Sequence, residues 1–415
     1  MESCNTESSL DLPLESLSLQ PFLQSLHKEQ WQEVRLGEVA KQIVSGGTPK
    51  STQAEYYNGN IPWLNTKEVK NCRIYATERQ ITELGLCNSS AKWIDKNSVI
   101  VAMYGATAGK VAINKIPLTT NQACCNISVD SEKANYNFIY YTLLDSFDRL
   151  DQMTSGAAQQ NLNVGLISNF TFLLPPLTIQ QKIAEILSSF DDKIDLLHRQ
   201  NKTLESLALT LFRHYFIDNP NRNEWEEVSL DDICLKIASG GTPSTTIKEY
   251  YCGNINWYST KEFNDNFLFN SVQTITENGL ANSSAKLFPK DTIVIAIYAA
   301  PTVGRLGILT QDSAFNQAAC GLIVDETQCS KEFIFLFLKN ERKNLNLLAS
   351  GSAQQNLNVE KIKSYTLALP DKNSLHCFNI QAKGFFDKIY NNTKQIQNLQ
   401  AMRDMMLRRM FESVN

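Results

Sequence analysis

A glycine-rich segment, Gly105–Lys110, is the first stretch whose residue types suggest chemistry. It resembles a phosphate-binding loop, but it is one residue too short and continues with Val111 instead of serine or threonine. A related segment, Ala299–Arg305, lacks the first glycine. A cation directly after a glycine, Lys110 or Arg305, suits a contact to a nucleic-acid phosphate better than a nucleotide site. The alternative is a surface cation that ends a turn.

Residues for catalysis on DNA do not come together in the sequence. A DNA methyltransferase would need an Asn/Asp-Pro-Pro-aromatic motif and a glycine-rich AdoMet loop, whereas Pro175 and Pro176 lie between two leucines. No group of carboxylates with a nearby lysine, as a metal nuclease requires, recurs in the chain. The four histidines are scattered, at His27, His198, His214 and His376. We therefore predict no catalytic residue and no metal site in this chain.

Small and polar residues in turns are the candidate contacts to DNA. Two glycines and a proline in Ser45–Pro49 make a tight turn, and small residues let a phosphate approach the backbone closely. Neighbouring amides such as Asn121 and Gln122 suit adenine, and a lysine such as Lys67 suits phosphate or guanine. Each of these residues could instead shape a turn or fill the core. The candidates are Ser45, Gly46, Gly47, Thr48, Lys67, Tyr104, Thr107, Lys110, Asn121, Gln122, Ser239, Gly240, Gly241, Thr242, Lys261, Tyr298, Thr302, Arg305, Asn316 and Gln317.

A long internal repeat organises the chain. The Ser-Gly-Gly-Thr-Pro stretch of Ser45–Pro49 returns as Ser239–Pro243, and Asn88–Lys92 returns as Asn282–Lys286, both 194 residues later. After an insertion near Pro301 the spacing becomes 195 residues and stays constant. A constant spacing across a domain-sized stretch indicates a tandem duplication.

Each copy is predicted to be a mixed α/β (α+β) globule, one over 31–175 and one over 225–370. Gly-Gly-Thr-Pro and Asn-Gly-Asn mark turns. Apolar β-rich runs indicate strands, and longer apolar runs with aromatic residues indicate short helices. The expected strands include 98–104 and 292–298, and the expected helices include 138–144 and 333–338.

Each copy is followed by a segment with a heptad repeat. Seam positions recur at alternating steps of four and three residues from Ile183 to Tyr215, which predicts a coiled-coil helix of about 50 Å. The second copy keeps the register with more polar residues, such as Asn392 and Arg403. An amphipathic surface helix is the alternative for each segment. The predicted seam residues are Ile183, Leu187, Phe190, Ile194, Leu197, Leu204, Leu211, Phe385, Ile389, Ile396, Leu399 and Met406.

Two such helices in one chain are expected to pair antiparallel, with the two globular copies related by a pseudo-two-fold axis. In the N-terminal segment, leucines between residues 10 and 23 could form an extra strand or helix against the C-terminal helix, or belong to a disordered tail. The predicted divisions are an N-terminal segment (1–30), a first domain (31–176), a central helix (177–222), a second domain (223–371) and a C-terminal helix (372–415).

Charge and composition limit the classes of partner. The net charge is −4, and residues 31–175 hold 13 Lys and Arg against 12 Asp and Glu, while 225–370 hold 12 against 15. Such domains cannot hold DNA by electrostatics alone. No apolar run reaches the roughly 20 residues that cross a bilayer, and the ten cysteines show no CxxC spacing. We expect a reduced, cytoplasmic protein without a membrane segment.

The order and duplication of these motifs resemble the specificity subunit of type I restriction–modification systems. The resemblance rests on Ser45–Pro49, Ile61–Trp63, Ile81–Leu86 and their second copies, each followed by a heptad helix, and it covers essentially everything after residue 30. It implies two target-recognition domains that read a bipartite site in double-stranded DNA. It also implies two methyltransferase subunits and restriction subunits as partners. Those partners would bind AdoMet, ATP and Mg²⁺, and this chain would bind no cofactor.

The sequence leaves other functions open and makes one prediction about the target. The alternatives are a self-contained enzyme with duplicated domains, a coiled-coil scaffold without a DNA role, and a recognition subunit of a methyltransferase-only or type II-like system. The similarity of the copies predicts related half-sites that approach an interrupted palindrome. The copies are dissimilar where Val69–Gln80 corresponds to Phe263–Thr274 and where Gly105–Lys110 corresponds to the longer Ala299–Arg305. If these loops contact base edges, the half-sites should differ at one or more positions.

Overall fold

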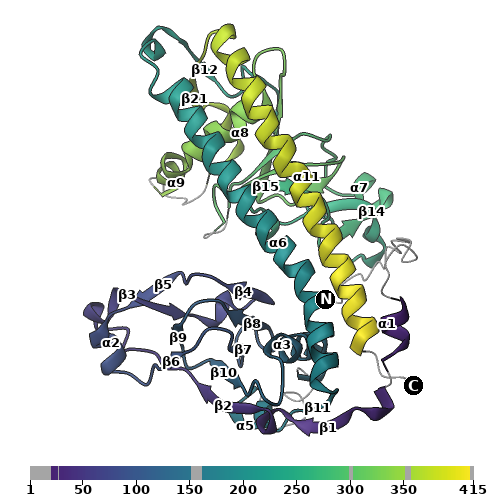
Figure 1. Ribbon diagram of the computed structural model, residues 1–415. Coiled ribbons are helices and arrows are strands. Elements are labelled where there is room, and N and C mark those ends of the chain that lie inside the picture. The colour runs from purple at the N-terminus through teal and green to yellow at the C-terminus, as the bar shows by residue number, and fades with distance from the viewer. Residues whose placement is uncertain (1–19, 27, 151–160, 299–301, 351–356, 412–415) are drawn as a thin grey trace. The chain divides into compact units, whose positions relative to one another are not determined.

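The computed structural model describes residues 20–26, 28–150, 161–298, 302–350 and 357–411 (Figure 1). The chain divides into two compact units. The first unit contains the described residues of 12–194 together with the end of the C-terminal helix from Leu399. The second unit contains residues 195–398. Each unit therefore combines one globular copy with parts of both long helices.

The first unit is built on two stacked sheets and a separate strand pair. The five-stranded sheet has the order β2 (Ala40–Ser45), β10 (Cys124–Val129), β7 (Val99–Ala102), β8 (Val111–Asn114) and β4 (Cys72–Ile74). The four-stranded sheet has the order β5 (Arg79–Ile81), β3 (Tyr57–Leu64), β9 (Leu118–Thr120) and β6 (Trp93–Ile94). The strand pair joins β1 (Gln32–Arg35) to β11 (Thr171–Leu174).

The central strand β7 is apolar throughout, and its side chains point alternately to the two faces of the five-stranded sheet, so both faces are covered. Val99 and Val101 of β7 pack in a cluster with Phe138 of α3 (Tyr136–Asp145). Their neighbours Ile100 and Ala102 pack on the opposite face, with residues such as Leu64 of the four-stranded sheet. Successive side chains of a strand point to opposite faces, so an apolar run without alternation has to be buried on both sides. The short helices of this unit are α1 (Gln20–Gln24), α2 (Glu83–Cys87) and α5 (Val164–Ser168).

The second unit repeats this architecture, except that an isolated bridge between Phe288 and Ser313 takes the place of the pairing of β6 with β9. Its five-stranded sheet has the order β13 (Cys234–Ser239), β20 (Ala319–Val324), β17 (Ile293–Ala296), β18 (Leu306–Leu309) and β15 (Asn266–Leu268). A three-stranded sheet joins β16 (Gln273–Ile275), β14 (Tyr251–Tyr258) and β19 (Ala314–Phe315), and β12 (Glu226–Ser229) pairs with β21 (Thr366–Leu369). Its shorter helices are α7 (Glu277–Ala281), α8 (Lys331–Asn340), α9 (Arg342–Ser350) and α10 (Val359–Lys363).

The backbone conformation of the turns is repeated as well. Asn71 and Asp265 occupy equivalent positions and both have a left-handed backbone, with φ of 56° and 62°. Asn97 and Asp291 form a second such pair, with φ of 66° and 69°. Asparagine and aspartate tolerate this conformation better than other residues with a side chain. The mixed α/β fold and its duplication are therefore confirmed.

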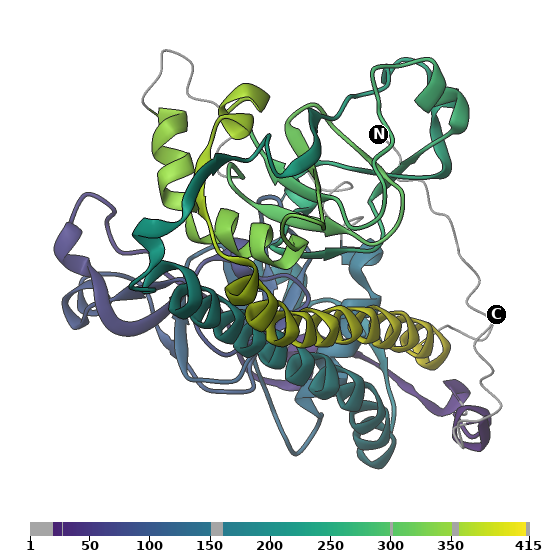
Figure 2. The same ribbon diagram turned by 90° about the horizontal axis from the view of Figure 1, so that it is seen from above.

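Two long helices, α6 (Leu177–Phe212) and α11 (Lys372–Phe411), lie side by side in antiparallel orientation (Figures 1 and 2). In the first unit, Asp191 near the middle of α6 pairs with Arg403 near the end of α11. In the second unit, the hydroxyl of Tyr215 accepts a hydrogen bond from Gln381 near the start of α11. Residue numbers thus rise on one helix as they fall on the other. A single π-helical turn, Arg213–Ile217, continues α6.

A buried pair of asparagines lies in the seam between the helices. Asn201 is 4% exposed and Asn392 is 1% exposed. The amide of Asn392 donates to Oδ1 of Asn201 at 2.9 Å, and the Asn201 amide donates to Thr393 Oγ1 at 3.2 Å. A polar pair of this kind is satisfied only when the two helices meet in one register.

The predicted seam residues face inward. None of them is exposed, whereas Leu196 and Leu207, which the heptad pattern leaves outside the seam, are 40% and 48% exposed. The buried seam residues are Ile183, Leu187, Ile194, Leu197, Ile389, Ile396 and Met406. The half-buried ones are Phe190, Leu204, Leu211, Phe385 and Leu399.

Each globular copy contacts the helices of its own unit through a different set of side chains. In the first unit, the Tyr141 hydroxyl donates to Oδ2 of Asp191 at 2.6 Å, and Arg403 donates to Oδ1 of the same carboxylate at 2.8 Å. Burial and then the negative charge of Asp191 raise the pKa of Tyr141, so this phenol stays protonated. In the second unit, Phe335 and Phe386 meet with their rings 5.6 Å apart.

The N-terminal segment contributes one short helix to the first unit. Leu26, which follows α1, is 8% exposed and belongs to the same apolar cluster as Met406 and Met410 of α11. Phe22 and Leu23 pack against that cluster. The remaining leucines of the segment, from Leu10 to Leu19, lie outside the described residues. Among the described helices, none is both long and apolar enough to cross a membrane.

Charged residues in the seam should separate the helices. We expect the double change Ile194→Asp and Leu197→Asp to reduce the free energy of unfolding by at least about 3 kcal/mol, because both side chains are buried and a carboxylate there would lack a partner. Thermal unfolding followed by circular dichroism measures the effect. The control is Leu196→Asp on the exposed side of the same helix, which should change stability little. Equal stability of the double variant and the control would place the seam elsewhere.

Candidate nucleic-acid interface

The loop Ser45–Pro49 follows β2 and is held by its backbone and by two aromatic side chains. The Gly46 and Gly47 amides donate to the carbonyls of Cys124 and Thr120 at 3.1 and 2.9 Å. The Trp63 indole donates to the Gly47 carbonyl at 3.0 Å, and the Tyr57 hydroxyl donates to the Pro49 carbonyl at 2.6 Å. These bonds fix the backbone of the loop before any ligand binds.

Both glycines of this loop are required by close packing and not by their φ angles. A Cβ atom on Gly46 would lie 2.1 Å from Thr120 Oγ1, and one on Gly47 would lie 2.2 Å from the Ala91 nitrogen. Both distances are far below van der Waals contact. The segment Asn88–Lys92 therefore packs directly against the loop and extends the surface that the loop presents.

Polar side chains from three other segments join the loop. The Thr48 hydroxyl hydrogen-bonds to the side-chain oxygen of Gln122, and the Tyr104 hydroxyl donates to the Gln122 carbonyl at 3.0 Å. The Thr107 hydroxyl donates to the Thr66 carbonyl, next to Lys67, at 2.8 Å. Residues separated by up to about 75 positions in the sequence thus form one polar surface in the first unit.

The second unit builds an equivalent surface. The Trp257 indole donates to the Gly241 carbonyl at 2.9 Å, and Thr242 hydrogen-bonds to the Gln317 side chain. The Lys286 ammonium group donates to the Ser239 carbonyl at 3.3 Å. A Cβ atom on Gly241 would lie 1.9 Å from the Ser284 carbonyl oxygen. The duplication has therefore preserved the packing that positions the polar side chains.

The candidates differ in how far they can reach a ligand. The exposed ones are Ser45, Thr48, Lys67, Gln122, Lys261 and Gln317. The half-buried ones are Tyr104, Thr107, Lys110, Ser239, Thr242, Tyr298, Arg305 and Asn316. The buried ones are Gly46, Gly47, Asn121, Gly240, Gly241 and Thr302. Which of them contact DNA stays a prediction.

Within each Asn-Gln pair, the glutamine is the residue that faces solvent. Asn121 is 8% exposed and its amide reaches Thr66 Oγ1 at 3.5 Å, whereas Gln122 is exposed. The side-chain oxygens of Asn121 and Asn316 are both buried without a hydrogen-bond partner among the described residues. The structure thus favours Gln122 and Gln317 as the amides that could read a base edge.

Lysines show a further difference between the copies. The Lys67 ammonium lies 2.7 Å from the Glu78 carboxylate, and this hydrogen bond lowers the pKa of Glu78. Both side chains are exposed, so Lys67 can exchange the carboxylate for a phosphate at small cost. In the second copy, Val272 stands at the position of Glu78.

Lys92 and Lys286 were not selected as candidates from the sequence. Their identical Asn-Ser-Ser-Ala-Lys context in both copies was the signal that could have pointed to them.

The glycine-rich segment is a turn between two strands. Gly105–Lys110 connects β7 to β8, whereas a phosphate-binding loop connects a strand to a helix. Gly109 and Gly304 adopt φ of 78° and 80°, which suits glycine in such a turn. Residues 299–301 of the second segment lie outside the described residues.

The central part of each dissimilar segment contacts the long helices of its own unit. The segment Val69–Gln80 contains β4, and there Arg73 pairs with Asp192 of α6 and donates to the Ser188 carbonyl at 3.3 Å. In the segment Phe263–Thr274, Asn266 of β15 donates to Thr393 Oγ1 of α11 at 3.1 Å. The cause is topological, because both strands are edge strands of the five-stranded sheet and lie against the helices.

The described part of the chain offers no arrangement for covalent or metal chemistry. No group of three or more His, Cys, Asp or Glu side chains that could hold a metal ion occurs among the described residues. Burial raises the pKa of the Cys125 thiol to about 12 and that of Cys320 to about 12, so these thiols are not reactive thiolates. Burial also lowers the pKa of His198.

The fold and the site define a class of proteins with two copies of one domain, each with an exposed polar loop cluster and each attached to a pair of antiparallel helices. The sequence pattern of the type I restriction modification DNA specificity domain matches residues 28–206 and again 222–400. The chain is 30% identical to the type I restriction enzyme MjaIX specificity subunit of Methanocaldococcus jannaschii, over 90% of each chain. The chain therefore belongs to the family of type I restriction–modification specificity subunits, which are recognition subunits and not catalytic ones.

Two further comparisons agree with this assignment. The type I restriction enzyme HindI specificity subunit of Haemophilus influenzae is 23% identical, over 92% of this chain and 98% of that one. The crystal structure of the type I restriction–modification S subunit from M. genitalium covers 93% of this chain and 97% of that chain, with a TM-score of 0.54 and 16% identity. At this identity the structural likeness concerns the fold alone.

Alanine at the second glycine of the loop should disturb the interface. We expect Gly47→Ala to destabilise the first unit by about 1–3 kcal/mol, because the new methyl group overlaps the backbone at Ser90 and Ala91. Chemical denaturation measures the change. The matched control is Gly384→Ala in α11, where no atom lies within 4 Å of the added Cβ and where alanine favours the helix by about 0.5–1 kcal/mol. A neutral Gly47→Ala would refute the packing argument.

Proposed function

We propose that the chain reads a bipartite DNA target, one half-site by each recognition domain, and leaves the DNA between the half-sites unread. The observation that carries this proposal is the repeated loop cluster, with Gln122 against Thr48 in one unit and Gln317 against Thr242 in the other. A duplicated reading surface suits a target with two related halves. The antiparallel pairing of α6 and α11 supports half-sites in opposite orientation, as in dimeric repressors.

The chain is further proposed to assemble with two methyltransferase subunits and with restriction subunits, in the cytoplasm, where these act on cellular DNA. Those partners would bind AdoMet, ATP and Mg²⁺. Support for helix-mediated assembly comes from Leu196 and Leu207, which are 40% and 48% exposed on the side of α6 away from the seam. Exposed leucines on a helix suit contact with another protein. Partners would also supply positive charge that the nearly neutral recognition domains lack.

DNA affinity should therefore depend on the partners. We expect the chain alone to bind any DNA only weakly, with a dissociation constant of about 1–100 µM at physiological salt. With methyltransferase subunits, the target should bind at about 10 nM or tighter, and the affinity should fall steeply with salt. Fluorescence anisotropy over a salt series measures both, with a scrambled duplex as the control. Tight, sequence-specific binding by the chain alone would contradict this expectation.

A domain duplication tests the bipartite target. In the chimera, residues 225–370 are replaced by a second copy of 31–175, and Ala208→Arg with Phe386→Asp recreate Asp191, which Tyr141 contacts, and Arg403, which binds Asp191. Expressed with its partners, the chimera should direct methylation to a symmetric interrupted palindrome built from one native half-site. Methylome sequencing reads the motif.

The native chain is the reference in that experiment and should give a bipartite motif with an unread spacer. A continuous motif, or a chimera whose motif equals the native one, would overturn the proposal.

A further inference from the structure

Each recognition domain contacts the helices of its own unit at equivalent positions, which are polar in the first unit and apolar in the second. In the first unit, Tyr141 of α3 contacts Asp191 of α6, which in turn binds Arg403 of α11. Tyr141 is 1% exposed and Asp191 is 7% exposed, so the hydrogen bond is sealed from water. The carboxylates of Asp191 and Asp404 raise the pKa of Arg403 although burial acts to lower it, which keeps the guanidinium charged.

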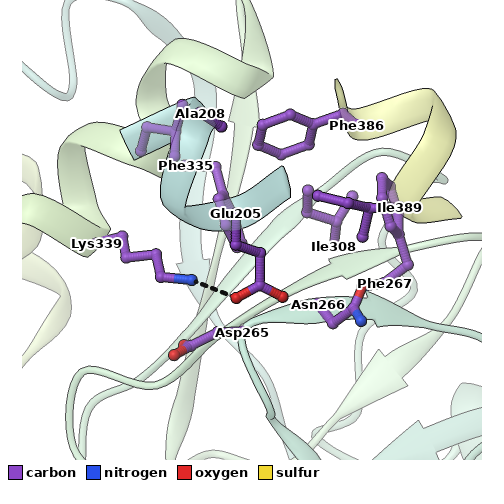
Figure 3. A pocket seen from close by; sticks show the side chains of 11 residues that line it. Glu205, Ala208, Asp265, Asn266, Phe267, Ile308, Phe335, Lys339, Phe386 and Ile389 are labelled. Carbon is purple, nitrogen blue, oxygen red and sulfur yellow. Dashed lines mark hydrogen bonds and ion pairs between the residues drawn. The ribbon is translucent and has the colours of Figure 1, made fainter. Parts of the chain in front are cut away.

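The repeat spacing of 195 residues places three apolar residues at the same positions in the second unit. Leu336 replaces the tyrosine, Phe386 replaces the aspartate and Ala208 replaces the arginine. All three are buried in one apolar cluster. A cavity of about 20 Å³ lies between them, with Phe267, Ile308 and Ile389 among its other lining residues (Figure 3). It is too small for a ligand, and it marks a packing contact between the domain and the helices.

A second position of the domain also changes from a charged to an aromatic side chain. Arg73 on the edge strand β4 pairs with Asp192 and reaches the Ser188 carbonyl of α6. Its equivalent on β15 is Phe267, whose ring lies 5.2 Å from Tyr390 and 6.3 Å from Phe386 of α11, edge to face in both cases. The domain side chain has thus changed from arginine to phenylalanine, and it meets Phe386 and Tyr390, which stand where the first unit has Asp191 and Asp195, whereas Asp387 keeps the aspartate of Asp192.

We propose that the helices carry two docking patches that fix which recognition domain occupies which position. The polar patch consists of Asp191 and Arg403, beside an aspartate that both units share, Asp192 here and Asp387 in the second unit, and it fits a domain with arginine on the edge strand and tyrosine on the helix. The apolar patch consists of Ala208, Phe386 and Tyr390, and it fits a domain with phenylalanine and leucine at those positions. The partner that each patch accepts is thus defined by two side chains of the domain.

Placing either domain on the patch of the other unit, with the helix residues unchanged, should lower the stability of the chain. The first domain on the apolar patch would bury its tyrosine hydroxyl against Phe386 with no acceptor. The second domain on the polar patch would place Leu336 and Phe267 against a carboxylate that has lost one of its hydrogen bonds. Where the halves of the target differ, as the proposed function expects, this selectivity also fixes the order in which they are read.

A mutant cycle in the first unit tests the patches on the full chain. The helix variant carries Asp191→Phe and Arg403→Ala, and the domain variant carries Arg73→Phe and Tyr141→Leu. Each should lower the midpoint of thermal unfolding by roughly 5–10 °C. The four-fold variant, which recreates the apolar contact, should regain most of that loss. Losses that simply add in the four-fold variant would overturn the proposal.

A second measurement covers the case in which a cycle variant does not fold. The chimera with 31–175 in place of 225–370 is purified with and without Ala208→Arg and Phe386→Asp. The matched chimera should melt at least about 5 °C higher than the unmatched one, and equal melting would refute the patches. Melting of the purified chain involves no DNA. A stable matched chimera that directs a continuous motif would therefore refute the proposed function and leave the patches intact.

Discussion

The pairing of α6 with α11 is the contact on which the rest of the molecule depends. Each helix gains stability by burying a narrow stripe of apolar side chains against the other. The buried Asn201–Asn392 pair restricts this packing to one register, because a shifted pairing would leave both amides without partners. Once the register is set, the residues that each recognition domain meets on the helices are set too.

The recognition surface depends in turn on close backbone packing in each domain. The loop of Ser45–Pro49 is held by the Trp63 indole, and it packs so closely on Thr120 and on Asn88–Lys92 that Gly46 and Gly47 leave no room for a Cβ atom. The backbone that carries the polar groups is therefore held by the core of the domain, and hydrogen bonds such as Thr48 to Gln122 orient their side chains. This arrangement allows exposed residues such as Gln122 to change without loss of the fold.

Duplication has been followed by divergence at specific places. The turns and the glycine loop are the same in both copies, and so is the indole hydrogen bond to the loop, which Trp63 donates in the first copy and Trp257 in the second. The contacts between domain and helices have diverged instead: apolar and aromatic side chains around Phe386 stand where the first unit has the polar set around Asp191, and the second unit adds an ion pair between Lys339 of α8 and Glu205 of α6. A single chain needs both domains in defined positions, and contacts of unlike polarity distinguish two domains that are otherwise similar.

The sequence by itself determined the duplication, the mixed α/β class and the heptad helices, because repeat spacing and hydrophobic periodicity are local properties of the chain. It also singled out the loop of Ser45–Pro49, since two glycines before a threonine and a proline signal a constrained turn. Only the tertiary structure decided that Gln122 faces solvent while Asn121 faces inward, and that β4 and β15 turn their side chains to the helices. Those features depend on long-range sheet order and helix packing, which residue spacing along the chain does not encode.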